Sequence, residues 1–148
     1  MDSRIISLNK VLKKYDVVLA YLFGSQKDSG IKYLHEQKIE IEDISDLDIG
    51  ILLETSPLHL YKFYGNLYYD LSAVFKPFNM DIVFLHEINY LFKYEITKGH
   101  RIYALDQDFG DEYEENIMKF ASDLSFKRRM FEKDFYEALE NGHFEIKL

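Results

Sequence analysis

The strongest constraint on the fold is an alternation of short apolar runs with longer segments of helical periodicity. Three short, nearly unbroken apolar runs, the pattern of buried strands, span Val17 to Phe23, Leu47 to Leu53 and Asp81 to Leu85. Apolar residues three or four positions apart predict helices over residues 3–14 and 58–75. Strands interspersed with helices indicate an α/β or α+β domain.

The last third of the chain adds one weak strand and more helix. Residues 87–98 are expected to form a short helix, and Ile102 to Leu105 a weak strand. Asp111 followed three residues later by Glu114 resembles a capping box, in which each residue hydrogen-bonds a free backbone N–H of the first helical turn. We therefore expect a long C-terminal helix over about 111–141.

Length and composition narrow the class of protein. A chain of 148 residues is about one ordinary domain, so we expect a single domain over 1–148. The absence of cysteine excludes disulfides, thiolate metal sites and cysteine nucleophiles. A net charge of −8 argues against a broad nucleic-acid face, because polyanion binding needs many Lys and Arg. No segment resembles a signal peptide or a membrane span, so we expect a cytoplasmic protein without a membrane partner.

Three aspartates stand at the starts of two predicted strands. Strand side chains alternate between faces, so Asp46 and Asp48 point the same way, with Cα atoms about 6.5–7 Å apart. Asp81 opens the next strand in the same manner. Three neighbouring carboxylates repel one another and raise their pKa values unless a cation lies among them. Because Mg²⁺ prefers such oxygen ligands, we predict that these three aspartates bind Mg²⁺.

The first predicted strand ends on Gly24 and Ser25, and two interpretations compete. The pair is either a plain polar turn or a loop that offers backbone N–H groups and a hydroxyl to a triphosphate, with Gly24 allowing close approach. Asp-x-Asp is a common pattern, and a second copy spans Asp106 to Asp108. No apolar strand follows that copy, so we interpret it as the acidic start of a helix.

The order of these motifs resembles that of the minimal nucleotidyltransferases of the DNA polymerase beta superfamily: Gly-Ser, a spacer, Asp-x-Asp and a later Asp. The resemblance covers about residues 21–85. It extends more loosely through "EITKGHRIYALDQD" and the closing helix, which are similar to the tail of the small antitoxin-type members paired with HEPN-domain toxins. It implies a small mixed sheet flanked by helices, with a long C-terminal helix.

The resemblance also implies a function and a role for each site residue. Asp46 and Asp48 hold metal, and Asp81 completes the metal site and helps to deprotonate the acceptor hydroxyl. Gly24 and Ser25 bind the triphosphate. The implied reaction is a Mg²⁺-dependent transfer of AMP from ATP to a hydroxyl, here a tyrosine of a HEPN toxin. The chain would then be the antitoxin of a toxin–antitoxin pair.

The sequence departs from the family pattern in two places. Twenty residues lie between Ser25 and Asp46, a longer spacer than the family has, and we interpret residues 26–45 as an insertion that is ordered in part. The arginine that often follows Gly-Ser is missing, and Lys27 is expected to contact the nucleotide as a point charge instead.

Two other functions stay open from the residues alone. The same fold could be a catalytically weak binding module that neutralises a partner by occlusion, or a small-molecule nucleotidyltransferase of the aminoglycoside-modifying kind. The aromatic stripe of Phe120, Phe131 and Phe135 is interpreted as core packing, and the alternative is an apolar surface for another chain. The oligomeric state, including a homo-oligomer, also stays open.

Overall fold

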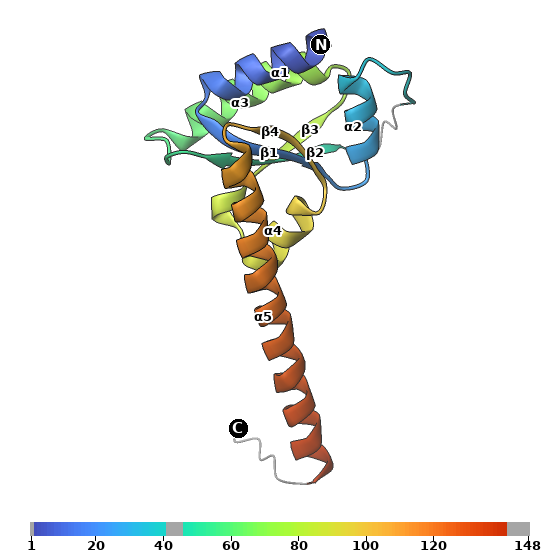
Figure 1. Cartoon of the computed structure of the whole chain (residues 1–148), viewed down its shortest axis with the longest axis vertical. Coiled ribbons are helices and arrows are strands. Elements are labelled where there is room, and N and C mark those ends of the chain that lie inside the picture. Colours follow the sequence, from blue (N-terminus) through green and yellow to red (C-terminus); the bar gives the residue numbers. More distant parts are fainter. Residues whose placement is uncertain (1, 41–45, 142–148) are drawn as a thin grey trace.

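The computed structural model describes residues 2–40 and 46–141, which form a small sheet with helices on both faces (Figure 1). In chain order the elements are α1 (Ser3–Lys14), β1 (Val17–Phe23), α2 (Lys27–Leu34), β2 (Leu47–Leu53), α3 (Leu60–Phe75), β3 (Met80–Phe84), η1 (Leu85–Glu87), α4 (Tyr90–Thr97), β4 (His100–Ala104) and α5 (Gln107–Glu140). Figure 1 shows α5 extending far from the sheet.

The sheet is mixed, as expected from the resemblance. Its four strands lie in the order β3-β2-β1-β4. β1 is antiparallel to both β2 and β4, whereas β2 and β3 are parallel and are joined by the crossover helix α3. The end of β1 and the starts of β2 and β3 therefore meet at one side of the sheet.

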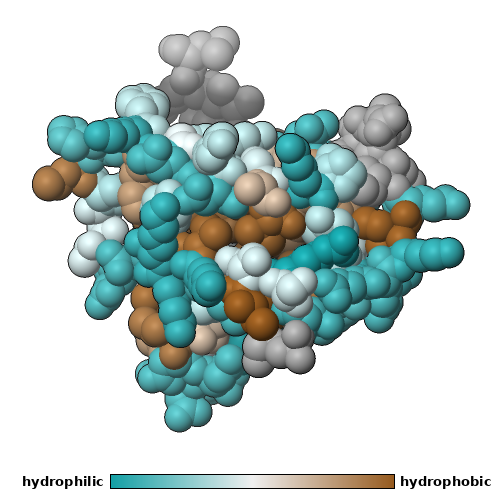
Figure 2. All heavy atoms as spheres, turned by 90° about the horizontal axis from the view of Figure 1, so that it is seen from above, coloured by the Kyte–Doolittle hydropathy of each residue, from teal (hydrophilic) through white to brown (hydrophobic). Residues whose placement is uncertain are grey.

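Two apolar cores hold the sheet from opposite faces. The larger core packs α1, α2 and α3 against one face, with Leu22, Ile49 and Leu71 fully buried in it. Figure 2 views the molecule from the side of α1 and α3. Apolar residues gather near the middle of this view, and hydrophilic residues surround them. The smaller core lies on the other face, where Ile96 of α4 packs with Tyr21 of β1.

The start of α5 differs from the prediction. The helix begins at Gln107, because the side chain of Asp106 accepts hydrogen bonds from two backbone N–H groups of the first turn. The predicted capping box is wrong: Asp111 and Glu114 form ion pairs with Arg101 of β4 instead. The interpretation of the second Asp-x-Asp as a helix start is confirmed.

The segment interpreted as an insertion contains a helix that periodicity did not predict. Residues 27–34 form α2, which packs on the sheet through Gly30. A Cβ atom on Gly30 would lie 2.8 Å from a methyl of Leu22 and 2.9 Å from one of Leu47. The last part of the segment, residues 41–45, lies outside the described residues.

The described residues contain no candidate for a membrane-spanning helix. None of the helices within residues 2–40 and 46–141 combines the length and the apolar character that crossing a bilayer requires.

We expect Gly50→Ala to destabilise the fold by about 1–3 kcal/mol, because the new Cβ would lie 2.5 Å from a methyl of the fully buried Ile96. The matched control is Gly65→Ala in α3, where no atom outside the neighbouring residues and the backbone of the helix lies within 4 Å of the new Cβ. That variant should be more stable than wild type by up to about 1 kcal/mol, through helix propensity. Urea unfolding of both variants measures the difference, and equal effects would contradict the packing argument.

Candidate active site

Strand register brings two of the predicted aspartates side by side. Asp48 of β2 pairs with Asp81 of the parallel strand β3 and, on its other side, with Phe23 at the end of β1. Leu47 and Ile49 are buried in the core under α1–α3, so Asp48 points to the opposite face, which carries α4. Asp46 is exposed just before β2.

The glycine of the Gly-Ser bend touches the central carboxylate. Gly24 has a φ of +76°, in the left-handed region that favours glycine. A Cβ atom at this position would lie 2.4 Å from Oδ2 of Asp48. The Gly-Ser bend is therefore in direct contact with Asp48 of β2. Position 24 requires glycine for two reasons: the positive φ and the lack of space for a side chain.

Electrostatics links the three aspartates. The pKa of Asp48 is raised, first by burial and then by the negative charges of Asp81 and Asp46. Carboxylate oxygens are the donors that Mg²⁺ takes, and a divalent cation relieves this kind of repulsion. Among the described residues, no three acidic or histidine side chains are arranged closely enough to hold a metal ion together. The donor chemistry fits the predicted cation, and the metal role of these residues stays a prediction.

A cavity of about 400 Å³ opens beside the Gly-Ser bend. It is lined by residues from the end of β1, the start of α2 and the end of α4: Phe23, Gly24, Lys27, Glu95, Lys98 and Gly99. The cavity carries the ammonium groups of Lys27 and Lys98 and the carboxylate of Glu95, and this net positive charge favours an anion such as a phosphate chain. Lys27 was predicted to contact the nucleotide, and Ser25 is exposed at the same bend.

Lys98 was missed by the sequence reasoning. It is ion-paired with Glu95 at 2.8 Å and lies near the bend because the backbone turns sharply at Gly99. A Cβ atom on Gly99 would lie 2.1 Å from the carbonyl oxygen of Leu22. In the sequence, Gly99 indicated only the end of a helix, so nothing pointed to a lysine beside the predicted phosphate loop.

His100 also has a role that the sequence did not indicate. Its Nε2 lies 2.7 Å from Oδ1 of Asp28, in the first turn of α2. This hydrogen bond lowers the pKa of Asp28. The contact joins the start of β4 to the helix that follows Gly24 and Ser25, and so helps to position that helix.

On the β3 side, the charge of Asp81 acts on an aromatic residue of α3. Burial raises the pKa of Tyr64, and the charge of Asp81 raises it further. The Tyr64 ring stacks on Tyr68 at a centroid distance of 6.0 Å and meets the edge of Phe84 at 6.1 Å. The sequence assigned Tyr64 and Tyr68 to the apolar stripe of α3, without a place near the acidic residues.

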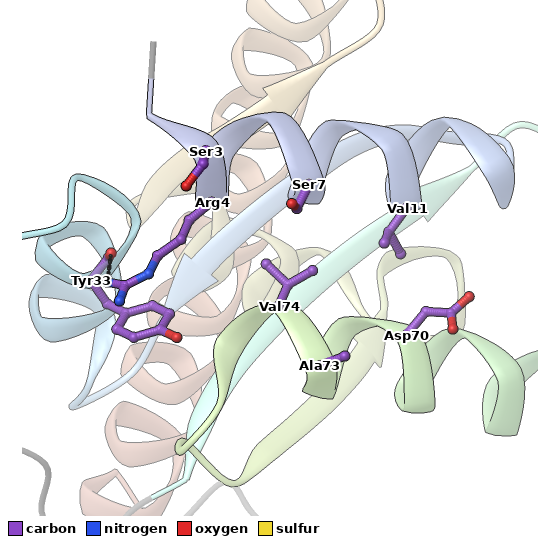
Figure 3. A pocket seen from close by; sticks show the side chains of 8 residues that line it. All are labelled: Ser3, Arg4, Ser7, Val11, Tyr33, Asp70, Ala73 and Val74. Atoms are coloured by element: carbon purple, nitrogen blue, oxygen red, sulfur yellow. Dashed lines mark hydrogen bonds between the residues drawn. The ribbon is translucent and has the colours of Figure 1, made fainter.

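Two larger cavities lie away from the Gly-Ser bend, and neither the bend nor any of the three aspartates lines them. One of about 610 Å³ adjoins the end of α3. The other, of about 470 Å³, lies between α1 and α3 (Figure 3). There Arg4 points toward Tyr33, donates a hydrogen bond to its carbonyl oxygen at 2.8 Å and lies 3.9 Å from its ring centre. The smaller cavity at the bend is lined by Gly24, which contacts Asp48.

We expect Asp48→Asn to raise the free energy of unfolding at pH 7, because it removes a partly buried charge that two neighbouring carboxylates repel. Since the folded-state pKa of Asp48 is raised, wild-type stability falls as the pH rises through that pKa, and the variant lacks this loss. The two proteins should converge near pH 3, below the ordinary aspartate pKa of about 3.9.

Thermal unfolding between acid and neutral pH measures this difference, with Asp123→Asn on the exposed side of α5 as control. If the stabilities of wild type and Asp48→Asn changed in parallel with pH, the negative charge of Asp48 would not destabilise the fold.

Comparisons with known proteins agree with this geometry. Residues 7–108 match the family described as Polymerase beta, Nucleotidyltransferase. No curated protein sequence matches the chain. Among solved structures, a chain from a mutant of the toxin–antitoxin MntA-HpeT aligns with a TM-score of 0.63 at 16% identity, covering 89% of this chain and 98% of that one.

Two further structures share the fold. A toxin–antitoxin with AMP-PNP aligns with a TM-score of 0.61 at 18% identity, covering 89% of this chain and 98% of that one. A tri-AMPylated Shewanella oneidensis HEPN toxin in complex with MNT antitoxin gives 0.58 at 15% identity, covering 90% and 96%. The family match spans the sheet, the Gly-Ser bend and all three aspartates, and the chain belongs to the polymerase beta nucleotidyltransferase family.

Proposed function

We propose that this protein transfers AMP from ATP to a tyrosine hydroxyl of a HEPN-domain toxin, with Mg²⁺, and acts as its antitoxin. The observation that carries the proposal is the contact of Gly24 with Asp48, with Asp81 in register on the next strand. A nucleotidyltransferase needs its phosphate-binding loop close to its metal-binding carboxylates, and the contact between Gly24 and Asp48 supports such an arrangement here.

The site residues have two proposed roles, which are metal binding and the positioning of the triphosphate. Asp46 and Asp48, with Asp81, would hold the metal, which supplies charge neutralisation at the transferring phosphate when bound. Gly24, Ser25 and the cationic cavity would position the triphosphate. The acceptor oxygen forms a bond to the α-phosphorus as the bond to pyrophosphate breaks.

The hydroxyl proton passes to Asp81 and then to water. Asp81 suits this role because it is exposed at the start of β3, the edge strand of the sheet. An acceptor side chain can approach it from that side without crossing the cavity at the bend.

The antitoxin role is supported by what the similar structures contain. Their descriptions name toxin–antitoxin complexes, one with AMP-PNP and one with an AMPylated HEPN toxin. Nearly the whole length of those chains aligns with this one, so no additional substrate domain is present in them. A protein acceptor, which brings its own binding surface, fits such a small enzyme better than a small molecule does.

We expect Asp48→Asn and Asp81→Asn each to lower AMP transfer by at least about 100-fold, the scale seen when a preorganised charge is removed from an active site. The assay incubates ATP and Mg²⁺ with a purified HEPN-domain toxin, and detects the adenylylated product by intact mass.

Asp108→Asn is the matched control, because Asp108 belongs to the second Asp-x-Asp, at the start of α5. It should keep wild-type activity. Transfer that persists in Asp48→Asn would refute the site. Binding of the toxin without any transfer by wild type would favour the occlusion module.

We expect Lys27→Ala and Lys98→Ala to weaken ATP binding by about 10–100-fold each, because each change removes a charge-assisted hydrogen bond to the triphosphate. Calorimetry with MgATP measures the change, with Lys10→Ala on the exposed side of α1 as control. Unchanged affinity in both cavity variants would place the triphosphate elsewhere.

A further inference from the structure

The cavity beside the Gly-Ser bend, which we call the bend cavity, is built by helices from opposite faces of the sheet (Figure 1). α2 carries Lys27 and packs on the face of the larger core. α4 carries Lys98 and packs on the other face. The end of β1 lies between them, with Phe23 and Gly24. The charges at the cavity therefore depend on how two separate helices are held.

His100 connects β4 to the start of α2. It pairs with Leu22 of β1, and paired residues of antiparallel strands share a face, so His100 points to the face that carries α2. Its Nε2 lies 2.7 Å from Oδ1 of Asp28 in the first turn of that helix. β4 and β2 lie on opposite sides of β1, so two strand spacings, about 10 Å, separate His100's strand from that of Asp48. His100 thus belongs to the side of the bend away from the aspartates.

The other polar side-chain contacts of α2 lie near its far end. Arg4 donates a hydrogen bond to the carbonyl oxygen of Tyr33 at 2.8 Å. His35, which follows the last residue of the helix, lies 3.0 Å from Asp2. Among the described residues, the contact with His100 is the one side-chain hydrogen bond that joins α2 to β4 or α4. The end of α2 beside the bend cavity is therefore held by His100.

The carboxylate of Asp28 is ionised in this contact. The hydrogen bond with His100 is the largest cause of the lowered pKa of Asp28, and the charge of Lys27 lowers it further. An ionised carboxylate only accepts hydrogen bonds, so Nε2 of His100 carries the proton. A neutral histidine with its proton on Nε2 can make the same bond, so the contact does not require a charged ring.

This contact decides where the negative charge next to Lys27 lies. Lys27 lines the bend cavity, and Asp28, the next residue, does not. Lys98 is ion-paired with Glu95 at 2.8 Å, whereas Lys27 has no ion pair among the described residues. The unpaired ammonium group of the cavity thus belongs to Lys27, beside a carboxylate that His100 already binds.

We propose that His100 is a positioning residue for the anion of the bend cavity, because it holds the carboxylate of Asp28 outside that cavity and leaves Lys27 free to bind a phosphate. A released carboxylate would be attracted to the ammonium groups of the cavity and would compete with the anion for them. His100 acts through Asp28 and does not touch the anion. The inference rests on the proposed function for the identity of the anion, which is the triphosphate of ATP.

Calorimetry of the full chain with MgATP tests this role. His100→Leu, which cannot donate to Asp28, should weaken binding by about 3–5-fold, the scale of an interaction between exposed charged groups. His100→Gln should bind like wild type, because its amide nitrogen can donate the same hydrogen bond. Equal weakening in both variants would show that the hydrogen bond is not what matters, and would overturn the proposal.

The matched control is His35→Leu, because His35 makes the other contact between a histidine and an aspartate on this helix, at its far end. This variant should bind MgATP like wild type. If His35→Leu weakened binding as much as His100→Leu, the effect would come from a general loosening of α2, and the role of His100 in directing charge would be wrong.

A double variant tests whether His100 acts through Asp28. In an Asp28→Ala background no carboxylate can enter the bend cavity, so adding His100→Leu should not weaken binding further. A 3–5-fold loss that persists in this background would mean that His100 contacts the anion itself, and would overturn the positioning role.

These measurements need no toxin and no transfer, so they separate this inference from the proposed function. Wild type that binds MgATP with the same affinity as His100→Leu would overturn the inference alone, and the proposed transfer would stand. Wild type that does not bind MgATP would overturn both.

Discussion

The site depends on one feature of the sheet, which is that β2 pairs in opposite senses with its two neighbours. Antiparallel pairing with β1 places the Gly-Ser bend against Asp48, and parallel pairing with β3 places Asp81 beside it. Had β3 been antiparallel as well, the chain would have entered it from the other end of the sheet and Asp81 would lie far from Asp48. The crossover helix α3 makes the parallel pairing possible.

Charge repulsion at this end of the sheet is balanced by packing elsewhere. The pKa of Asp48 is raised by burial and by two like charges, so its ionised form opposes folding. The strands remain in place because both faces carry buried apolar side chains, including Ile49 on one face and Tyr21 on the other. Tyr21 also donates a hydrogen bond to Glu114 of α5 at 2.9 Å, which ties the long helix to the sheet.

Prediction succeeded where local pattern and tertiary packing agree. The bounds of β1 and β2 follow from apolar runs that end in turn-forming or acidic residues, since a strand buried on both faces is nearly continuously apolar. The start of α5 was misplaced, because Asp111 and Glu114 pair with Arg101, a residue of a neighbouring strand that no local pattern reveals. Phe131 of the aromatic stripe is 71% exposed, and the stripe was assigned to a core because periodicity shows that a helix has an apolar face but not what covers it.

The sequence by itself determined the strands, most of the helices and the order of Gly24, Asp48 and Asp81, because these depend on periodicity and on residues that end elements. The tertiary structure alone decided that Gly24 contacts Asp48, that Lys98 joins Lys27 at one cavity, and that His100 holds α2. These are contacts between elements, and strand pairing, which brings distant residues together, leaves no local trace in the chain.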